Sequence, residues 1–340
     1  MRNRQIVLKA YPEGMPKESD FSLVEGEAPA PKEGEVLVRT VYLSLDPYMR
    51  GRMTQRRSYS PPWKLGAVCE GGTVGQVVAS KDKAFAEGDF VTGMGGWQDF
   101  SIGTRADLRK LDPKLAPIST AVGVLGMPGH TAYAGVVKMA ELKPGETLFV
   151  SAASGAVGGL VGQIAKLKGA RAVGVAGSDE KCDFVVKELG FDACFNHRGD
   201  LAAGFAEHCP KGIDVDFENV GGDVFWNAFA RMNLHGRVII CGFISAYNDQ
   251  APPPGPDRSG AILGGALVNR LTIRGLLVYD HRHSFDEFQR EMASWIKSGK
   301  IKYREDVVEG LENAVTAFQG LLVGKNFGKM LVRVSADPTR

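Results

Sequence analysis

The sequence predicts an α/β protein of two domains, one β-rich and one built on a doubly wound parallel sheet. The chain has 340 residues, which is longer than one average domain. Its first part, about 110 residues long, holds short β-rich runs separated by Gly, Pro and Asp, a spacing typical of a small barrel or sandwich. After residue 120, helical stretches alternate with short apolar strands, which indicates a parallel sheet covered by helices.

The expected elements follow from these two patterns. In the β-rich part we expect strands over residues 4–11, 35–45, 71–80 and 88–94. In the alternating part we expect strands over 147–153, 171–177, 193–197, 214–220, 237–243 and 271–278. The helices are expected over 121–140, 158–169, 178–190, 223–234 and 284–299, with a last helix over 311–324 and a last strand over 328–334. Residues 250–260, rich in Pro and Gly, are expected to form an active-site or interface loop.

Charge and hydropathy exclude several classes of function. The net charge is +2, from 41 basic and 39 acidic residues spread along the chain, so we expect no nucleic-acid partner. No apolar run approaches the roughly 20 residues of a membrane span, and the N-terminus lacks the apolar core of a signal peptide, so we expect a cytoplasmic protein without a membrane partner. One basic cluster forms either a solvated loop or the rim of a site for a polar substrate: Arg50, Arg52, Arg56 and Arg57.

The cysteines and histidines predict no metal site. The five cysteines form no CxxC pair, and their odd number indicates reduced thiols rather than a disulfide framework. They are Cys69, Cys182, Cys194, Cys209 and Cys241. Only His281 and His283 have a spacing that zinc ligands could use, and they lie in a polar stretch that is typical of a surface.

A glycine-rich turn is the strongest local signal of a ligand. The strand over 147–153 runs into Gly155, Ala156, Val157 and Gly158, and a helix follows at once. Glycines in such a turn let backbone amides approach a pyrophosphate, and the helix N-terminus adds a favourable dipole. The spacing AxxGxxG is weak evidence by itself, but its place between a strand and a helix, with a second strand next, favours a dinucleotide site.

The end of the second strand predicts which dinucleotide binds. NAD-specific sites usually place an acid there for the ribose 2′-hydroxyl, whereas this strand ends in Ala176 and Gly177. Lys181, in the next helix, can reach a 2′-phosphate, with His197 or Arg198 as a second donor. The alternative for Lys181 is a solvent-exposed lysine. We therefore expect NADP(H) as the cofactor.

Two further strand ends are expected to face the cofactor. Asn219 closes the fourth strand of the parallel sheet, and Cys241, Gly242 and Tyr247 close the fifth. Ligands of open parallel sheets bind at the carboxyl ends of the strands, so these side chains should line the site.

Seven ordered motifs resemble those of one known family. They are LSLDPYMRGRM, GHTAYAG, AASGAVG, GSDEK, ENVGG, CGFISAYN and GKNFGK, and together they span nearly the whole chain. They are similar to the zinc-independent branch of the medium-chain dehydrogenases/reductases, which includes prostaglandin and leukotriene reductases, plant alkenal double-bond reductases and bacterial curcumin reductases.

The resemblance implies a fold, a cofactor and an assembly. The fold would be a GroES-like β-rich domain over 1–120, completed by 303–340, with a Rossmann NADP-binding domain over 121–302. The protein would commonly be a homodimer. The family's cofactor contacts would fall on Gly155 to Gly158, Lys181, Asn219, Cys241 to Tyr247, Leu276, Leu277, Val278 and Asn326. One departure is His197, because relatives commonly have a tyrosine there. A histidine gains charge on protonation, so we expect the preference for NADPH to be steeper at low pH.

The missing zinc ligands bear on the reaction. Neither the catalytic cysteine and GHE motif of zinc alcohol dehydrogenases nor their four-cysteine lobe has a counterpart, and Cys69 with Glu70 cannot hold zinc alone. Without a Lewis acid, hydrogen-bond donors must stabilise charge on a carbonyl oxygen, which suits conjugate reduction. Tyr48 and Tyr247 are the candidate donors, because a phenol keeps its proton at pH 7. Whether one of them or water supplies the α-proton stays open.

We therefore expect NADPH-dependent reduction of the carbon–carbon double bond of α,β-unsaturated aldehydes or ketones, with an enone or alkenal as the small-molecule substrate. Two alternatives are a quinone oxidoreductase of the same superfamily and a non-catalytic nucleotide-binding protein. The natural substrate is not predicted. Several apolar side chains serve either as walls of its pocket or as core: Met49, Met53, Met127 and Tyr279.

Overall fold

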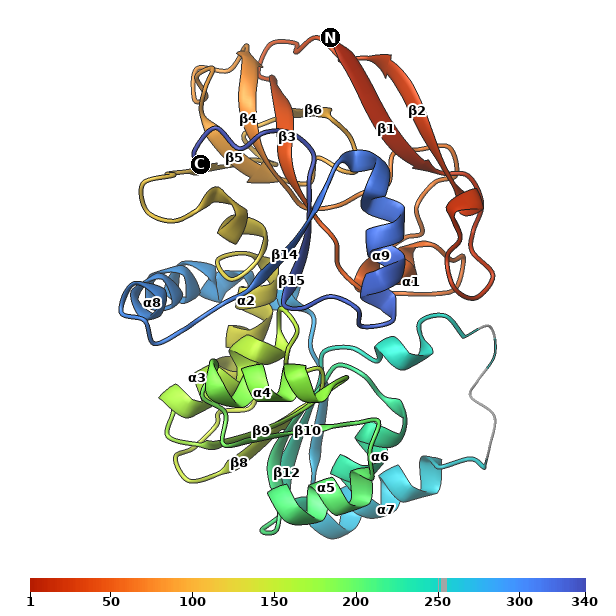
Figure 1. Cartoon of the computed structure of the whole chain (residues 1–340), viewed down its shortest axis with the longest axis vertical. Helices are drawn as coiled ribbons and strands as arrows, with labels where there is room; N and C mark the ends of the chain where they lie inside the picture. The colour runs from red at the N-terminus through yellow and green to blue at the C-terminus, as the bar shows by residue number, and fades with distance from the viewer. Residues whose placement is uncertain (250, 252–255) are drawn as a thin grey trace. The chain divides into compact units, whose positions relative to one another are not determined.

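The computed structural model describes residues 1–249, 251 and 256–340, and it divides into two compact units. The first unit comprises residues 1–126 and 305–340, and the second comprises residues 127–304. Figure 1 labels helices and strands of both units. The α/β fold predicted from the sequence is confirmed, with a β-rich unit and a parallel sheet flanked by helices. No helix among the described residues has the length and hydropathy that a membrane span requires.

The first unit contains two sheets. Strands β1 (Arg2–Leu8) and β2 (Phe21–Glu27) form an antiparallel pair. The second sheet has seven strands: β3 (Val36–Ser44), β4 (Thr73–Ser80), β5 (Phe90–Gly93), β6 (Phe100–Gly103), β7 (Arg109–Leu111), β14 (Glu305–Glu309) and β15 (Lys329–Arg333). In it β15 runs antiparallel to β3, with Val332 opposite Leu43, so the C-terminal segment completes the sheet. The helices are α1 (Tyr48–Arg52) and α9 (Ala314–Leu322), with 3-10 turns at Glu18–Asp20, Ile118–Val122 and Leu311–Asn313.

The second unit is built on six parallel strands in the order β10-β9-β8-β11-β12-β13. They are β8 (Thr147–Val150), β9 (Arg171–Ala176), β10 (Ala193–Asn196), β11 (Ile213–Glu218), β12 (Met232–Ile240) and β13 (Thr272–Gly275). Its α-helices are α2 (Met127–Tyr133), α3 (Gly158–Leu167), α4 (Asp179–Lys187), α5 (Leu201–His208), α6 (Gly222–Phe229), α7 (Ser259–Asn269) and α8 (Phe285–Lys297). Shorter helical pieces cover Ala134–Met139, Ile244–Ala246 and Val278–Ser284.

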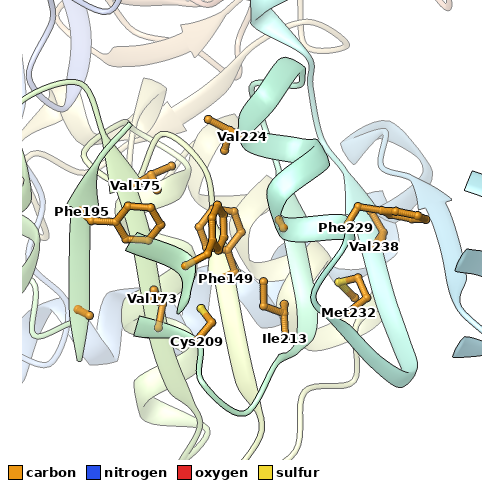
Figure 2. Packing of buried hydrophobic residues seen from close by; sticks show 13 residues of the cluster. Phe149, Val173, Val175, Phe195, Cys209, Ile213, Val224, Phe229, Met232 and Val238 are labelled. Atoms are coloured by element: carbon orange, nitrogen blue, oxygen red, sulfur yellow. The ribbon is translucent and has the colours of Figure 1, made fainter. Parts of the chain in front are cut away.

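A buried apolar cluster fills the space between this sheet and helices α5 and α6. Phe149 of β8 is fully buried in its middle, with Phe195 on one side and Phe229 on the other (Figure 2). A helix that packs on a sheet buries its apolar stripe in this way. The alternation of apolar strands with helices predicted α6 of this layer, whereas α5 was not among the expected helices. The cluster fixes the strands whose carboxyl ends carry the candidate site.

Two predicted helices differ from the structure. The helix expected over 223–234 ends at Phe229, because Met232 begins β12 and pairs with Ile213 of β11. Tertiary pairing of strands therefore overrides the local helical pattern. The helix expected over 121–140 begins only at Met127, since the backbone at Gly123 has a non-helical conformation. Part of the predicted 250–260 loop, residues 250 and 252–255, lies outside the described residues.

Candidate active site

The turn between β8 and α3 lets its backbone approach a ligand closely. Ala152 adopts a left-handed conformation with φ 53°, and a Cβ built on Gly158 would lie 2.3 Å from the Ala152 carbonyl oxygen. Only glycine fits at this position without moving the turn. Among the residues that the structure describes, the amides of Ala156 and Val157 donate to no protein acceptor. These donors, at the N-terminus of α3, suit the pyrophosphate of a dinucleotide.

Strand order places this turn where the chain reverses direction across the sheet. From β8 the chain moves outward to β9 and β10, and then returns to β11 on the other side of β8. Dinucleotides bind at such a switch point, outside the carboxyl ends of the strands. The predicted cofactor residues of the second unit follow the six strands: Gly155 to Gly158 after β8, Lys181 after β9, His197 after β10, Asn219 after β11, Cys241 and Gly242 after β12, and Leu276 to Val278 after β13.

Lys181 lies close enough to His197 for its charge to act on the histidine. Both residues follow strands on the same side of β8. Ser178 caps α4 and accepts a hydrogen bond from the Lys181 amide at 3.3 Å, which fixes the backbone there. The His197 amide donates to the Ala176 carbonyl at 3.1 Å, so the histidine is held beside the end of β9. Burial, then Arg198, then Lys181 lower the pKa of His197. A group of cationic and neutral donors at this point suits a 2′-phosphate.

Glu218 ties the glycine turn to the loop after β11. Its side chain is buried, and one carboxylate oxygen accepts hydrogen bonds from the Ser151 hydroxyl and the Gly221 amide, each at 2.8 Å, and from the Val220 amide. The Ser151 hydroxyl in turn accepts from the Asn219 amide at 2.7 Å. Burial raises the pKa of the Glu218 carboxyl. Glu218 therefore positions Asn219 against the turn that would hold the pyrophosphate.

The segment after β12 lies against the same loop. The amides of Cys241 and Gly242 both donate to the Glu218 carbonyl, at 2.9 and 3.0 Å. A Cβ built on Gly242 would lie 3.0 Å from the Tyr247 hydroxyl oxygen and 3.3 Å from the Asn219 carbonyl oxygen. The structure thus places the Tyr247 hydroxyl beside the end of β12, close to Asn219. One strand further, the Leu276 amide donates to Ile240 at 2.9 Å, and Leu277 and Val278 follow, half-buried.

Comparison with known proteins identifies the family. Residues 4–111 match the family described as the N-terminal domain of oxidoreductase, and residues 156–298 match the zinc-binding dehydrogenases. The NADPH-dependent curcumin reductase of Escherichia coli (strain K12) is 50% identical over 338 residues, which cover 99% of this chain and 98% of that protein. The 2-alkenal reductase (NADP(+)-dependent) of Nicotiana tabacum is 43% identical, with 98% of each chain covered. The chain belongs to the medium-chain dehydrogenases/reductases, in the branch of the curcumin, alkenal and prostaglandin reductases.

A solved structure of this branch agrees with the fold. CurA of Vibrio vulnificus, crystallised in complex with NADPH, has a TM-score of 0.95 and 47% sequence identity, and the match covers 98% of this chain and 100% of that one. The resemblance seen in the seven sequence motifs is therefore confirmed over the full length. The NADPH in that crystal belongs to the relative, and it matches the cofactor predicted from Lys181 and the strand end before it.

In the first unit of this protein, Tyr48 is the first residue of α1. Residues Asp46 and Pro47 precede it, and a buried ion pair fixes them, because Lys329 of β15 donates to Asp46 at 2.9 Å and to the Leu45 carbonyl at 2.6 Å. Tyr48 itself is half-buried. The C-terminal strand thus positions the Tyr48 loop. Asn326 belongs to the same unit, where its side chain donates to the Gly328 carbonyl at 2.8 Å.

The predicted basic cluster divides in the structure, because Arg56 and Arg57 are exposed, as expected of a solvated loop, whereas Arg50 is buried. Arg50 is 2% exposed and donates to the carbonyls of Pro12 and Gly14, at 3.3 and 2.8 Å, so it is neither a solvated residue nor the rim of a site. Arg52 pairs with Glu70 at 2.9 Å. A guanidinium has five donors and no acceptor, which suits it to hold loop carbonyls in this way. The prediction was wrong for Arg50 because sequence spacing does not reveal burial.

Of the residues described, no three His, Cys, Asp or Glu side chains are grouped so that they could hold a metal ion. Cys69 is buried, and burial raises the pKa of its thiol. The neighbouring carboxylate, Glu70, is bound by Arg52. His281 is half-buried rather than on the surface, whereas His283 is exposed. Of the predicted wall residues, Met49 and Met53 are fully buried core, while Tyr279 is 49% exposed.

Sequence reasoning missed residues in each unit that organise a loop with a predicted site residue. Glu218 and Ser151 organise the loop that carries Asn219, and Lys329 organises the loop that carries Tyr48. The signal for Glu218 was an acid inside an apolar strand, a residue type that is seldom buried without partners. Lys329 stands in the sequence nearly 300 residues after its partner, so only the fold reveals that contact.

Proposed function

We propose that this protein is an NADPH-dependent reductase of the carbon–carbon double bond of α,β-unsaturated aldehydes and ketones, active in the cytoplasm without zinc. The observation that carries the proposal is the group formed by Lys181 and His197 beside a glycine turn, in a chain that is 50% identical over nearly its full length to a curcumin reductase. The 2-alkenal reductase among its relatives indicates the same bond as the target.

The residues of the second unit fit the cofactor in three places. Ala156 and Val157 offer amides to the pyrophosphate, and Gly158 leaves room for it. Lys181 and His197 offer donors to the 2′-phosphate. Asn219 and the Cys241 to Tyr247 segment stand on the other side of the turn, where the nicotinamide half would lie. Bound NADPH supplies the hydride that adds to the β-carbon of the substrate.

The protein must then stabilise the negative charge that develops on the substrate carbonyl oxygen. A hydroxyl aimed at that oxygen donates a hydrogen bond that strengthens as the enolate forms, and a fixed donor costs no reorganisation at that moment. We assign this role to the phenol of Tyr48 or Tyr247. Tyr247 is held beside Gly242, and the Lys329–Asp46 pair fixes the loop before Tyr48. The α-carbon takes its proton from a tyrosine or from water.

The decisive experiment is a substrate panel with NADPH as the reductant. Oxidation of NADPH is followed at equal concentrations of a 2-alkenal, an enone, a benzoquinone and the matching saturated ketone. We expect the first two to be reduced and the products to be the saturated carbonyl compounds, identified by mass. Reduction of the saturated ketone in place of the enone would overturn the proposal, and a clear preference for the benzoquinone would support the quinone oxidoreductase alternative.

We also propose that the protein is a homodimer formed through β13 and α7. Strand β13 is at the end of the parallel sheet, and no further strand pairs with it among the residues that the structure describes. Helix α7 is packed through Ile262, while Leu263 and Leu267 are 71% and 79% exposed. An open strand edge and exposed leucines on the helix that precedes this strand in the chain support pairing with a second copy.

A further inference from the structure

Two cysteines of the second unit place their sulfur atoms 3.0 Å apart. Cys182 lies in the first turns of α4 and is buried, and Cys194 lies on β10 and is half-buried. A disulfide has a sulfur–sulfur distance of about 2.05 Å, so closing a bond requires a movement of only about 1 Å. Cysteine reactivity depends on the thiolate. The two thiols differ in how readily they form it, because the pKa of Cys182 is lowered and that of Cys194 is raised.

The surroundings of Cys182 favour its thiolate. The hydrogen bond from the Cys194 thiol is the main cause that lowers the pKa of Cys182, and the Ala176 backbone acts in the same direction. Burial and the carboxylates of Asp179 and Asp183 oppose these effects. By contrast, burial raises the pKa of Cys209 to about 11 and that of Cys241 to about 12. Cys182 is therefore set apart from these other thiols as a nucleophile.

We propose that Cys182 and Cys194 form a redox modification site, at which a hydroperoxide generates a disulfide that weakens the binding of NADPH. The effect on NADPH rests on the proposed function, whereas the formation of the disulfide does not.

The chemistry proceeds in two balanced steps. The Cys182 thiolate attacks the peroxide oxygen, the oxygen–oxygen bond breaks, and the leaving alkoxide or hydroxide takes a proton, so that Cys182 becomes a sulfenic acid. The Cys194 sulfur then gives up its proton and attacks the sulfur of the sulfenic acid, the sulfur–oxygen bond breaks, and the leaving hydroxide takes up a proton to become water. Together the two thiols lose two electrons and two protons, and the peroxide is reduced to water and an alcohol, or to two waters. A thiol reductant reverses the change by exchange.

The position of the pair connects it to the cofactor site. Lys181 directly precedes Cys182, and His197 follows Cys194 by three residues. A second link, the hydrogen bond from Asn196 to Asp179 at 3.0 Å, already joins the same ends of β10 and α4. A disulfide would pull the first turns of α4 toward β10 and change the spacing of Lys181 and His197. Donors to a phosphate lose strength steeply with misplacement, so the affinity for NADPH should fall while that for NADH, which lacks the phosphate, should change little.

The experiment measures the disulfide and the affinity separately on the full-length protein. The reduced protein is treated with hydrogen peroxide, and non-reduced peptides are examined by mass spectrometry for the linked Cys182–Cys194 pair, which is lighter by two hydrogens. NADPH and NADH are titrated without substrate, before and after oxidation. We expect the linked peptide, a rise of about fivefold or more in the Kd for NADPH, less than about twofold for NADH, and recovery with dithiothreitol. Bound NADPH should slow the oxidation, because the coupling is reciprocal.

Three variants sharpen the test. Cys182→Ser and Cys194→Ser should each abolish the linked peptide and the change in NADPH affinity, and the half-buried position of Cys194 makes it the safer substitution if the first does not fold. Cys209→Ala removes another thiol of the same unit and should respond to peroxide like the wild type. Absence of the linked peptide, or a linked protein with unchanged NADPH affinity, would refute the proposal. Failure of the reduced protein to bind NADPH would overturn the proposed function and the NADPH effect together, while the linked peptide would still report on the thiol chemistry.

Discussion

We expect the selectivity for NADPH to depend most on the side chain of Lys181. A hydrogen bond between charged groups contributes about 1.5–3 kcal/mol, so Lys181→Ala should raise the KM for NADPH about tenfold or more. The KM for NADH should change by less than about twofold, because NADH has no 2′-phosphate. Steady-state kinetics with both cofactors provide the measurement. Lys187→Ala is the matched control, since Lys187 lies on the same helix and pairs with Asp183 at the surface. Equal losses with both cofactors would show that Lys181 acts on the fold rather than on the phosphate.

His197 should make the preference for NADPH depend on pH. Its pKa is lowered in the free protein by burial and by two neighbouring cations, and a bound phosphate raises it again. The affinity for NADPH should therefore increase as the pH falls through the pKa of His197 in the complex, and decrease as the pH rises. The ratio of the KM values for NADH and NADPH should be larger at pH 6 than at pH 8.

His197→Gln separates this effect from titration of the phosphate. The 2′-phosphate itself takes up a proton near pH 6, which weakens binding equally in both proteins. The variant keeps a neutral donor, so its ratio should vary less with pH than that of the wild type. Identical pH profiles for the two proteins would show that protonation of His197 does not cause the pH dependence of the preference for NADPH.

The two candidate tyrosines can be distinguished by removing one hydroxyl at a time. Loss of a donor to a developing oxyanion lowers kcat about 100-fold or more, with little effect on the binding of NADPH. Tyr48→Phe and Tyr247→Phe should be compared for kcat with a 2-alkenal and for the Kd of NADPH. The tyrosine that contacts the enolate is the one whose loss lowers kcat alone. If both variants keep the wild-type kcat, neither phenol stabilises the enolate.

For single residues, the sequence predicts positions along the fold but not the contacts that depend on packing. The positions of Lys181 and Tyr247 after strand ends could be predicted, because parallel strands bring their carboxyl ends to one edge of a sheet. Their roles stay predictions. The contact between Cys182 and Cys194 could not be predicted, because it depends on how α4 packs on β10. The burial of Arg50 was also beyond prediction, since its partners are backbone carbonyls with no sequence signature.

Strand β11 contains an unusual feature at the scale of an element. Asp216 is fully buried, its two neighbours in register are Phe149 and Val238 of the apolar cluster, and neither of its carboxylate oxygens has a hydrogen-bond partner among the described residues. Burial, and then Glu218, raise its pKa well above the usual value. We therefore expect the folded protein to favour the protonated form of Asp216.

Asp216→Asn should stabilise the protein increasingly as the pH rises. In the unfolded chain Asp216 ionises near pH 3.9, so above that value the wild-type folded state binds one more proton than the unfolded state. Wild-type stability should then fall by up to about 1.4 kcal/mol per pH unit until the raised pKa is reached, and the asparagine removes this loss. Urea unfolding at pH 5 and pH 7 measures the difference, with Asp214→Asn on the same strand as the control. A gain that is equal at both pH values would contradict a protonated Asp216.

The prediction of elements succeeded where a pattern recurs along the chain, and it failed where an element forms only through its contacts. All six strands of the parallel sheet were expected, because short apolar runs recur between helices. Strands β2 and β14 were not, since their residues are mostly exposed or half-buried and form strands only by pairing with β1 and β15. Helices α1, α5 and α7 were also missed. In α7 the apolar residues surround the helix rather than forming one stripe.

At the scale of the whole molecule, we expect the exposed leucines of α7 to form the contact between two copies. A monomer would leave Leu263, Leu267 and Val268 at 71%, 79% and 68% exposure in water. Burial of apolar surface contributes about 25 cal/mol per Å², so pairing with a second copy is the favourable outcome at this helix. We expect a particle of twice the 36.6 kDa chain mass by light scattering after size exclusion.

Leu267→Glu should convert this particle to a monomer, because each interface would then bury two uncompensated carboxylates related by the symmetry of the dimer. Leu115→Glu is the matched control, since Leu115 is equally exposed, at 83%, but belongs to the first unit. The mass of the control should stay that of the wild type. Far-UV circular dichroism and NADPH titration of both variants ensure that a change in mass reflects the interface rather than unfolding. A folded Leu267→Glu protein that keeps the dimer mass would place the interface on another surface, and the apolar face of α7 would then need a different partner.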